Sequence, residues 1–292
     1  MENAELLQLA IAGLKNGSIY ALLALGFTIV YAATNVINFA QGEFFMLGGM
    51  FAVFAFETLG LPLLAAVPLA VLAVTGVGVL FEVLAIRPRR DGDQMSLVII
   101  TVGGSLVLSS LARHLFGSDA LPMPEFTPGP SLAVAGAAIE RQTLWIWGLV
   151  LIAVVGLTLL YSRTRLGRAM RACMQNREAA RLMGIDTGRV VMISFALAAM
   201  LGALAGVAVT PLTSTRFDIG AGIAVKGFAA AILGGLGSPV AAVAGGLLLG
   251  LIEQAVIPFS STMKDVVAIV VLLAVLFIRP QGLFVRSRKE KM

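Results

Sequence analysis

Long stretches free of charged residues alternate with short polar segments along most of this chain of 292 residues. A helix needs about 20 consecutive apolar residues to cross the hydrocarbon core of a bilayer. Uncharged stretches cover residues 19–42, 58–81, 94–112, 142–162, 190–215, 227–252 and, more briefly, 266–278. The pattern therefore predicts an all-α fold, a polytopic transmembrane helical bundle in which residues 1–292 form a single domain.

Two polar or glycine-rich interruptions divide these stretches further. Residues 234–239 read GGLGSP, a string that breaks a helix, so we expect a short helix over 226–233 and a longer one over 240–257. With a further helix over 44–59, about eight to ten membrane elements are expected, including short or re-entrant ones. The polar segment 35–43 also leads into a glycine-rich helix. Such matching interruptions are typical of an internal transporter repeat, although two unrelated glycine-rich helices would give the same pattern.

Basic residues gather in a few of the segments between the apolar stretches. They are concentrated in residues 86–93, 163–189 and 286–291, whereas the proline-rich segment 113–141 carries few. Loops rich in lysine and arginine stay in the cytoplasm. We therefore expect the first three segments to be cytoplasmic and segment 113–141 to be periplasmic, with the N-terminus outside and the C-terminus in the cytoplasm.

Composition excludes several classes of function. Apolar residues make up 59% of the chain and charged residues 13%, about half of the charged share in a soluble domain. One cysteine (Cys173) and one histidine (His114) exclude a disulfide framework and a usual zinc site, so we expect no metal and no cofactor. No Gly-Lys dipeptide occurs, hence no Walker A loop, and ATP would have to bind to another subunit. Cytoplasmic loops explain the net charge of +5 without nucleic acid, and no convergent catalytic set indicates an enzyme.

A few charged residues fall within the apolar stretches, where burial is expensive unless the charge is paired or hydrated. We expect Lys15, Glu82 and Lys226 to lie near enough to an interface for their side chains to reach it. Glu253 and Gln254 occur together in a later stretch. They either face a wet cavity or form a buried polar contact between helices.

The polar segment before the second helix poses the same choice more sharply. Asn35, Asn38 and Gln41 recur at near-helical spacing and are followed by Glu43. One hypothesis is a wet cavity lined by Asn38, Gln41 and Glu43, as part of a translocation path. The alternative is a buried polar network that only holds helices together.

Segment 163–189 is the most distinctive of the polar segments. From Arg168 to Met183 it has neither proline nor glycine, its residues favour helix, and Gly184 would end that helix. Apolar residues at near-helical spacing, including Met170 and Cys173, make it amphipathic. Such a helix either docks on a partner domain or lies on anionic lipid.

Several strings resemble one known family when taken in order. They are residues 17–28 (GSIYALLALGFT), 38–43 (NFAQGE), 166–172 (LGRAMRA), 180–185 (ARLMGI), 226–238 (KGFAAAILGGLGS), 264–267 (KDVV) and 280–283 (PQGL). Through them the chain, from about residue 13 to residue 283, resembles the permease subunits of branched-chain amino acid ABC importers, of the LivH type. Permeases for urea and short amides are similar.

The resemblance implies a bacterial inner-membrane protein that works with several partners. These are a second homologous permease subunit, two cytosolic ATP-binding subunits and a periplasmic substrate-binding protein, with lipid around the bundle. The helix at 167–184 then resembles a coupling helix, and the residues expected to couple it to the ATPase are Gly167, Arg168, Arg171, Glu178, Leu182 and Gly184. The residues expected along the translocation path are Asn35, Asn38, Gln41, Glu43, Lys226, Gly235 and Gly237.

One departure bears on the substrate. Gln41 stands where the family is expected to have histidine, so a urea or short-amide importer remains an alternative to a branched-chain amino acid importer. A stand-alone, ATP-independent secondary transporter is a further alternative and would need no coupling helix. An intramembrane enzyme and a purely structural subunit explain fewer of the polar residues.

Overall fold

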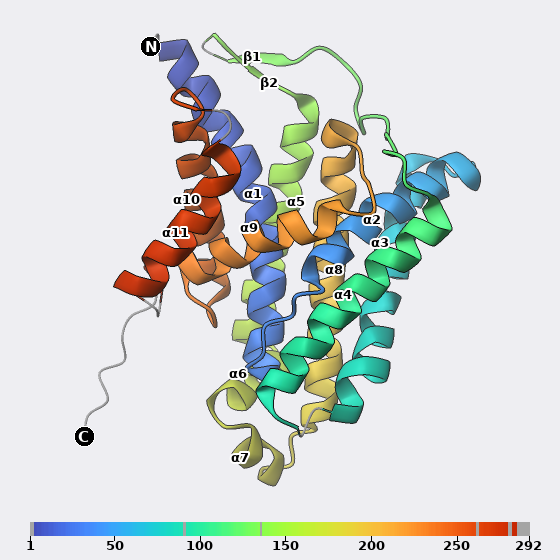
Figure 1. Ribbon diagram of the computed structural model, residues 1–292, viewed down its shortest axis with the longest axis vertical. Helices are drawn as coiled ribbons and strands as arrows, with labels where there is room; N and C mark the ends of the chain where they lie inside the picture. Colours follow the sequence, from blue (N-terminus) through green and yellow to red (C-terminus); the bar gives the residue numbers. More distant parts are fainter. Residues whose placement is uncertain (1–2, 90–91, 135, 261–262, 280–281, 285–292) are drawn as a thin grey trace.

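Six helices of the computed structural model are long and apolar enough to cross a membrane (Figure 1). The structure describes residues 3–89, 92–134, 136–260, 263–279 and 282–284. The long helices are α1 (Asn3–Thr34), α3 (Leu63–Phe81), α4 (Gln94–Phe116), α5 (Arg141–Arg163), α8 (Thr187–Thr213) and α10 (Pro239–Val256). Helix α3 continues through a π-helical turn, η2 (Glu82–Ile86), and a 3-10 turn, η3 (Arg87–Arg89).

Shorter elements complete the described part of the chain. They are α2 (Gln41–Val53) with its π-helical extension η1 (Phe54–Thr58), α6 (Arg165–Gln175), α7 (Arg177–Leu182), α9 (Ile219–Gly234) and α11 (Lys264–Ile278). Strands β1 (Leu132–Val134) and β2 (Ala137–Ile139) form a small antiparallel hairpin. The predicted polytopic α-helical bundle is confirmed, short elements included.

Helix α1 runs through the middle of the bundle, where it packs against α10, α8 and α9. Glycines allow the backbones to touch, as their four-residue spacing permits. A Cβ atom added to Gly246 of α10 would lie 2.5 Å from the backbone nitrogen of Ala21, and one added to Gly206 of α8 would overlap the carbonyl oxygen of Phe45 in α2. Close backbone contact therefore fixes α10 against α1 and α8 against α2.

The first predicted apolar stretch, 19–42, is divided in the structure. Helix α1 ends at Thr34, and Asn35 takes a left-handed conformation with a φ of 56°, which asparagine tolerates better than most residues. The Thr34 hydroxyl donates to the Val30 carbonyl (2.8 Å) and accepts from the Val36 amide (3.1 Å), and so caps this end. The short helix α2 then begins inside the bundle, at Gln41.

The break predicted at 234–239 is present, but the helix before it is longer than expected. Helix α9 begins at Ile219, directly after Asp218, rather than near Lys226. Gly235 and Gly237 have φ values of 109° and 104°, a region that favours glycine. The Ser238 hydroxyl then caps the first turn of α10.

The single helix predicted across 168–183 is wrong, since the structure contains two helices there. Asn176 is extended (φ −158°, ψ 107°), and its side chain accepts a hydrogen bond from the amide of Ala179 at 2.9 Å. Asparagine is among the strongest N-cap residues, so it ends α6 and starts α7 without any proline or glycine. Gly184, with a φ of 82°, follows the end of α7 as predicted.

The polar segments gather at two opposite ends of the bundle (Figure 1). Helices α6 and α7 lie at one end with the start of α4, and Gly92, Gln94 and Arg177 line one pocket there. The β-hairpin lies at the other end, where the Gln8 side chain of α1 bonds to both backbone groups of Ala138. Segments 86–93 and 163–189 thus share one end, opposite to 113–141. The basic segment 286–291 lies outside the described residues.

The two short helices that follow α1 and α8 meet inside the bundle. A Cβ atom added to Gly42, in the first turn of α2, would overlap the carbonyl oxygen of Gly220, in the first turn of α9. Each half of the chain thus contains a long helix followed by a short one, and the starts of the two short helices are in contact. An internal repeat is compatible with this arrangement and stays a prediction.

Candidate functional site: an interior cavity and its two ends

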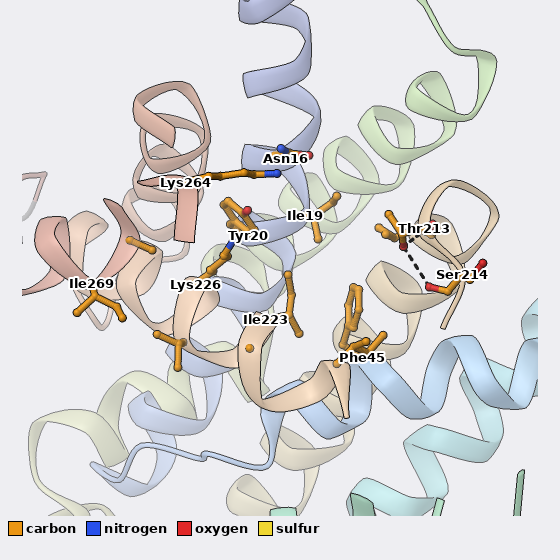
Figure 2. A pocket seen from close by; sticks show the side chains of 15 residues that line it. Asn16, Ile19, Tyr20, Phe45, Thr213, Ser214, Ile223, Lys226, Lys264 and Ile269 are labelled. Carbon is orange, nitrogen blue, oxygen red and sulfur yellow. Dashed lines mark hydrogen bonds between the residues drawn. The ribbon is translucent and has the colours of Figure 1, made fainter. Parts of the chain in front are cut away.

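A cavity of about 630 Å³ lies between α1, α2, α8, α9 and α11, in the part of the bundle distant from α6 and α7 (Figure 2). Helix α8 ends at this cavity, and α9 and α11 begin at it. Most of the residues in its wall are apolar, and the polar residues of the wall are Asn16, Tyr20, Thr213, Ser214, Lys226 and Lys264. This size and lining are typical of sites for small organic molecules.

A buried polar triad forms one side of the cavity and joins three helices. The ammonium group of Lys226 (α9) donates to Glu253 Oε1 (α10) at 2.6 Å, and the hydroxyl of Tyr20 (α1) donates to Glu253 Oε2 at 2.5 Å. Glu253 is fully buried, and the Lys226 side chain is 16% exposed. The Lys226 charge is therefore satisfied inside the bundle, and the expectation that its side chain reaches the interface is wrong.

The other two charges expected near an interface differ from each other. Lys15 forms an ion pair with Glu140 (2.8 Å), and both side chains are partly exposed at the hairpin end of the bundle. Glu82 is only 1% exposed, in the π-helical turn η2, so the interfacial placement expected for it is wrong. A π-helical turn contains more residues than an α-helical turn. Here it directs the carboxyl group of Glu82 into the bundle rather than outward.

The polar cluster Asn38, Gln41 and Glu43 lies inside the bundle but outside the wall of the large cavity. Gln41 Nε2 donates to the carbonyl of Ala198 in α8 (2.9 Å), and the hydroxyl of Ser105 in α4 donates to Glu43 Oε1 (2.9 Å). Each of the three side chains is buried and bonds to its surroundings rather than to another member of the cluster, and Asn38 Nδ2, Gln41 Oε1 and Glu43 Oε2 have no hydrogen-bond partner among the described residues. The choice between a buried polar network and a wet cavity therefore stays open. The place of the cluster on a translocation path stays a prediction.

Asn35 lies at the opposite end from the large cavity. It lines a second, more polar cavity of about 360 Å³ with residues of α7 and of the start of α4, among them Arg177, Glu178 and Arg181. A very small cavity beside Asn38 shares Thr34 with it. Asn35 and Asn38 thus line two small adjacent cavities, whereas Lys226 lines the large cavity.

Gly235 and Gly237 lie where three segments distant in sequence meet. The amide of Leu283 donates to the carbonyl of Leu233 (2.9 Å) at the end of α9, and Gly282 packs against Gly235. A Cβ atom added to Gly237 would lie 3.3 Å from the sulfur of Met174 in α6. The loop after α9 is therefore held between helix α6 and the segment 282–284.

The residues expected to couple the ATPase fall into two groups. Arg168, Glu178 and Leu182 are exposed, and Leu182 is 89% exposed although it is apolar. Gly167 is buried, because α6 packs so closely on the end of α5 that a Cβ atom there would overlap the Leu160 carbonyl. The guanidinium group of Arg171 donates to the Tyr161 carbonyl, which fixes α6 to α5.

The apolar face of α6 is fully used within the bundle. Met170 and Cys173 are buried where α6 packs against α1, α5 and α8. Burial raises the pKa of the Cys173 thiol, and the charge of Arg177 offsets part of that shift. The thiol is therefore expected to be protonated and unreactive at neutral pH.

Sequence reasoning assigned no role to three residues of the cavity wall. Asn16 and Lys264 line it, and Tyr20 both lines it and bonds to Glu253. Lys264 belongs to the string 264–267, and a lysine at the start of an apolar helix could have indicated a polar position there. The pairing of Lys226 with Glu253 had no local signal, because 27 residues separate them.

A many-helix membrane bundle with a cavity of solute size, broken helices beside it and an exposed basic helix pair at one end defines a membrane transport permease. Residues 9–276 match the family described as branched-chain amino acid transport system / permease component, and the chain belongs to this family. It is a multi-pass membrane protein and a transport subunit rather than an enzyme.

Individual relatives cover nearly the whole chain. The permease protein BraD of the high-affinity branched-chain amino acid transport system of Pseudomonas aeruginosa is 35% identical over 98% of this chain and 98% of its own. The corresponding permease LivH of Escherichia coli is 33% identical over 98% of this chain and 97% of its own. Among solved structures, an inward-facing conformation described as a metal-chelate type ABC transporter gives a TM-score of 0.52 at 16% identity, over 92% of this chain and 86% of that chain. That likeness supports the fold alone.

Proposed function

We propose that this chain is the membrane-spanning permease subunit of an ATP-binding-cassette importer for branched-chain amino acids. The observation that carries the proposal is the identity of 33–35% with BraD and LivH over nearly the full length of both. The proposed partners are a second homologous permease, two cytosolic ATP-binding subunits and a periplasmic substrate-binding protein. We propose the bacterial inner membrane as its location.

The proposed orientation places helices α6 and α7 in the cytoplasm. Segments 86–93 and 163–189 lie at this end and carry most of the described arginines, as cytoplasmic loops do. The N-terminus then lies outside with the β-hairpin, and the C-terminus, which follows α11, lies in the cytoplasm. The large cavity accordingly belongs to the periplasmic half of the bundle.

We propose that α6 and α7 dock on the ATP-binding subunit rather than on lipid. A helix on a membrane surface directs its apolar face to the lipid, but the apolar face of α6 already packs against α1, α5 and α8. What remains outside is polar, apart from Leu182 and Met183, which are 89% and 83% exposed at the end of α7. Two adjacent exposed apolar side chains, surrounded by charged ones, would be covered if this end of the helix pair docked on a protein.

Movement of α6 could reach the large cavity through the loop after α9. Met174 of α6 lies near Gly237 in this loop, and α9 carries Lys226 into the cavity wall. The buried cluster of Asn38, Gln41 and Glu43 lies between this cavity and the cavity that contains Asn35. We propose that the translocation path joins the two cavities and that this cluster closes it in the present conformation.

The test is co-purification followed by transport. Tagged protein is extracted in mild detergent, the subunits that co-purify are identified by mass spectrometry, and the complex is reconstituted with the cognate binding protein. Leucine uptake that requires ATP and the binding protein is expected. Uptake of urea or an amide instead would favour the alternative substrate class, and ATP-independent uptake by this chain alone would overturn the importer.

A further inference from the structure

We propose that the 630 Å³ cavity binds the transported amino acid, with its carboxylate on Lys264 and Asn16 and its aliphatic side chain on the wall formed by α8 and α9. This inference rests on the proposed function and adds a substrate-binding site inside the permease itself.

One of the two positive charges of the wall has no counter-ion among the described residues. Lys226 and Lys264 are the charged residues among those that line the cavity. Lys226 is neutralised by Glu253, both of whose carboxylate oxygens are engaged, by Lys226 and by Tyr20. Lys264 forms no ion pair with any residue in the described part of the chain. An ammonium group beside an aliphatic wall is costly without a counter-ion, which an incoming carboxylate would supply.

Lys264 and Asn16 are placed to act together. Figure 2 shows the ammonium end of Lys264 turned toward Asn16, one helical turn before Tyr20 on the same face of α1. Within the described residues the Asn16 side chain has no hydrogen-bond partner, so its amide is available to a ligand. A charged ammonium and an amide donor can bind the two oxygens of one carboxylate.

The opposite wall matches an aliphatic side chain. Phe45, Val209, Ile219 and Ile223 line it and carry no charge. Thr213 and Ser214 lie there as well, and hydroxyl oxygens can accept hydrogen bonds from an ammonium group. The cavity therefore complements an amphiphilic zwitterion better than a neutral amide, which lacks the carboxylate that Lys264 requires.

The test is equilibrium binding of labelled leucine to the nucleotide-free complex without its periplasmic binding protein. Leucinamide, which lacks only the carboxylate charge, serves as competitor. In the unaltered complex leucine should bind about tenfold or more tightly than leucinamide, as expected for one charge-assisted contact. In Lys264→Gln this preference should disappear, and in Lys264→Arg it should persist. Lys15→Gln, a change at a lysine outside the cavity, should retain it.

Assembly of the complex and ATP turnover without substrate are measured for each variant. Asn16→Ala, which keeps the lysine, is the second variant should Lys264→Gln fail to assemble, and it should reduce the preference for leucine severalfold. An unchanged preference in the assembled variants would overturn the proposal, as would absent leucine binding in a complex that imports leucine. Phosphatidylglycerol is added as a competitor. If it abolished the preference for leucine over leucinamide, Lys264 would be assigned to a lipid headgroup, and the proposed amino acid site would be overturned as well. A complex that imports no leucine would instead refute the proposed function.

Discussion

Lys226 and Glu253 form an ion pair inside the bundle, with 2.6 Å between Nζ and Oε1. The two residues come from α9 and α10, on either side of the glycine-rich break, and Tyr20 ties the same carboxylate to α1. Helix α9 also packs against α1, α2, α10 and α11, and the ion pair adds a polar contact that joins it to α10 and, through Tyr20, to α1. This pair therefore helps to fix the position of α9, the element that carries Lys226 into the cavity wall.

Breaking the pair on one side should destabilise the protein strongly. Glu253→Leu alone removes the carboxylate that accepts from both Lys226 and Tyr20. Breaking a buried ion pair from one side typically costs about 3–5 kcal/mol of stability. The double variant Lys226→Met with Glu253→Leu removes both charges and should recover most of that loss. Unfolding of the purified protein in mild detergent with increasing SDS measures the stability of the single and the double variant. Equal loss in the single and double variants would contradict the pairing, and Glu57→Gln at an exposed site is the control.

A methyl group added at Gly206, where α8 touches α2, should disturb packing, whereas one added at Gly148 should not. Gly206→Ala places a methyl group on the Phe45 carbonyl, and such overpacking costs about 1–3 kcal/mol. Gly148→Ala in α5 has open space within 4 Å and should be neutral. The readout is thermal unfolding in detergent, and a similar melting temperature for the two variants would count against the contact.

Alanine at both Arg171 and Glu178 should lower ATP turnover stimulated by substrate and binding protein. Arg171 bonds α6 to the end of α5, and Glu178 lies exposed in α7. The change should loosen the docking helices while leaving insertion into the membrane intact. Turnover is measured in proteoliposomes against the amount of assembled complex, and Arg165→Ala, before the predicted contact, is the control. Unaltered stimulation would remove the coupling role from these two residues.

The segment 282–284 should affect transport through its backbone, in which the amides of Leu283 and Phe284 donate to the carbonyls of Leu233 (2.9 Å) and Gly234 (3.3 Å). Leu283→Pro removes the amide that donates to the Leu233 carbonyl, whereas Leu283→Ala removes the side chain and retains that amide. A hydrogen bond of this kind contributes about 1 kcal/mol, so uptake should fall several-fold in the proline variant and little in the alanine variant. The reverse order would show that the Leu283 side chain, and not its amide, holds the end of α9.

Cys173 should be alkylated slowly at neutral pH and faster as the pH rises. The thiolate is the reactive form, and burial raises the pKa of this thiol, so the thiolate fraction at pH 7 is below that of an exposed cysteine. Iodoacetamide labelling followed by mass spectrometry from pH 7 to pH 10 measures the rate. SDS-unfolded protein, in which the thiol is exposed, should label rapidly throughout. Fast labelling of the folded protein at pH 7 would mean that α6 does not bury this residue.

Much of the architecture could be predicted from local sequence. Charge-free stretches locate the long helices because the hydrocarbon core accepts few charges, and GGLGSP marks the break between α9 and α10 because its glycines adopt positive φ values. Asn176 shows the limit of such reasoning. An asparagine inside a run of helix formers can either continue the helix or cap a new one. Which of the two occurs at Asn176 depends on how α6 and α7 pack at the end of the bundle.

The candidate site could be predicted from the sequence less completely than the fold. The sequence alone determined that this protein is a membrane bundle with basic loops at one end, because hydropathy and charge act on each segment independently of the others. Only the tertiary structure decided that Lys226 meets Glu253 and that Lys264 and Asn16 line one cavity. The reason is physical, since a charge in an apolar helix must find a counter-ion or water, and no local pattern specifies which distant helix supplies it.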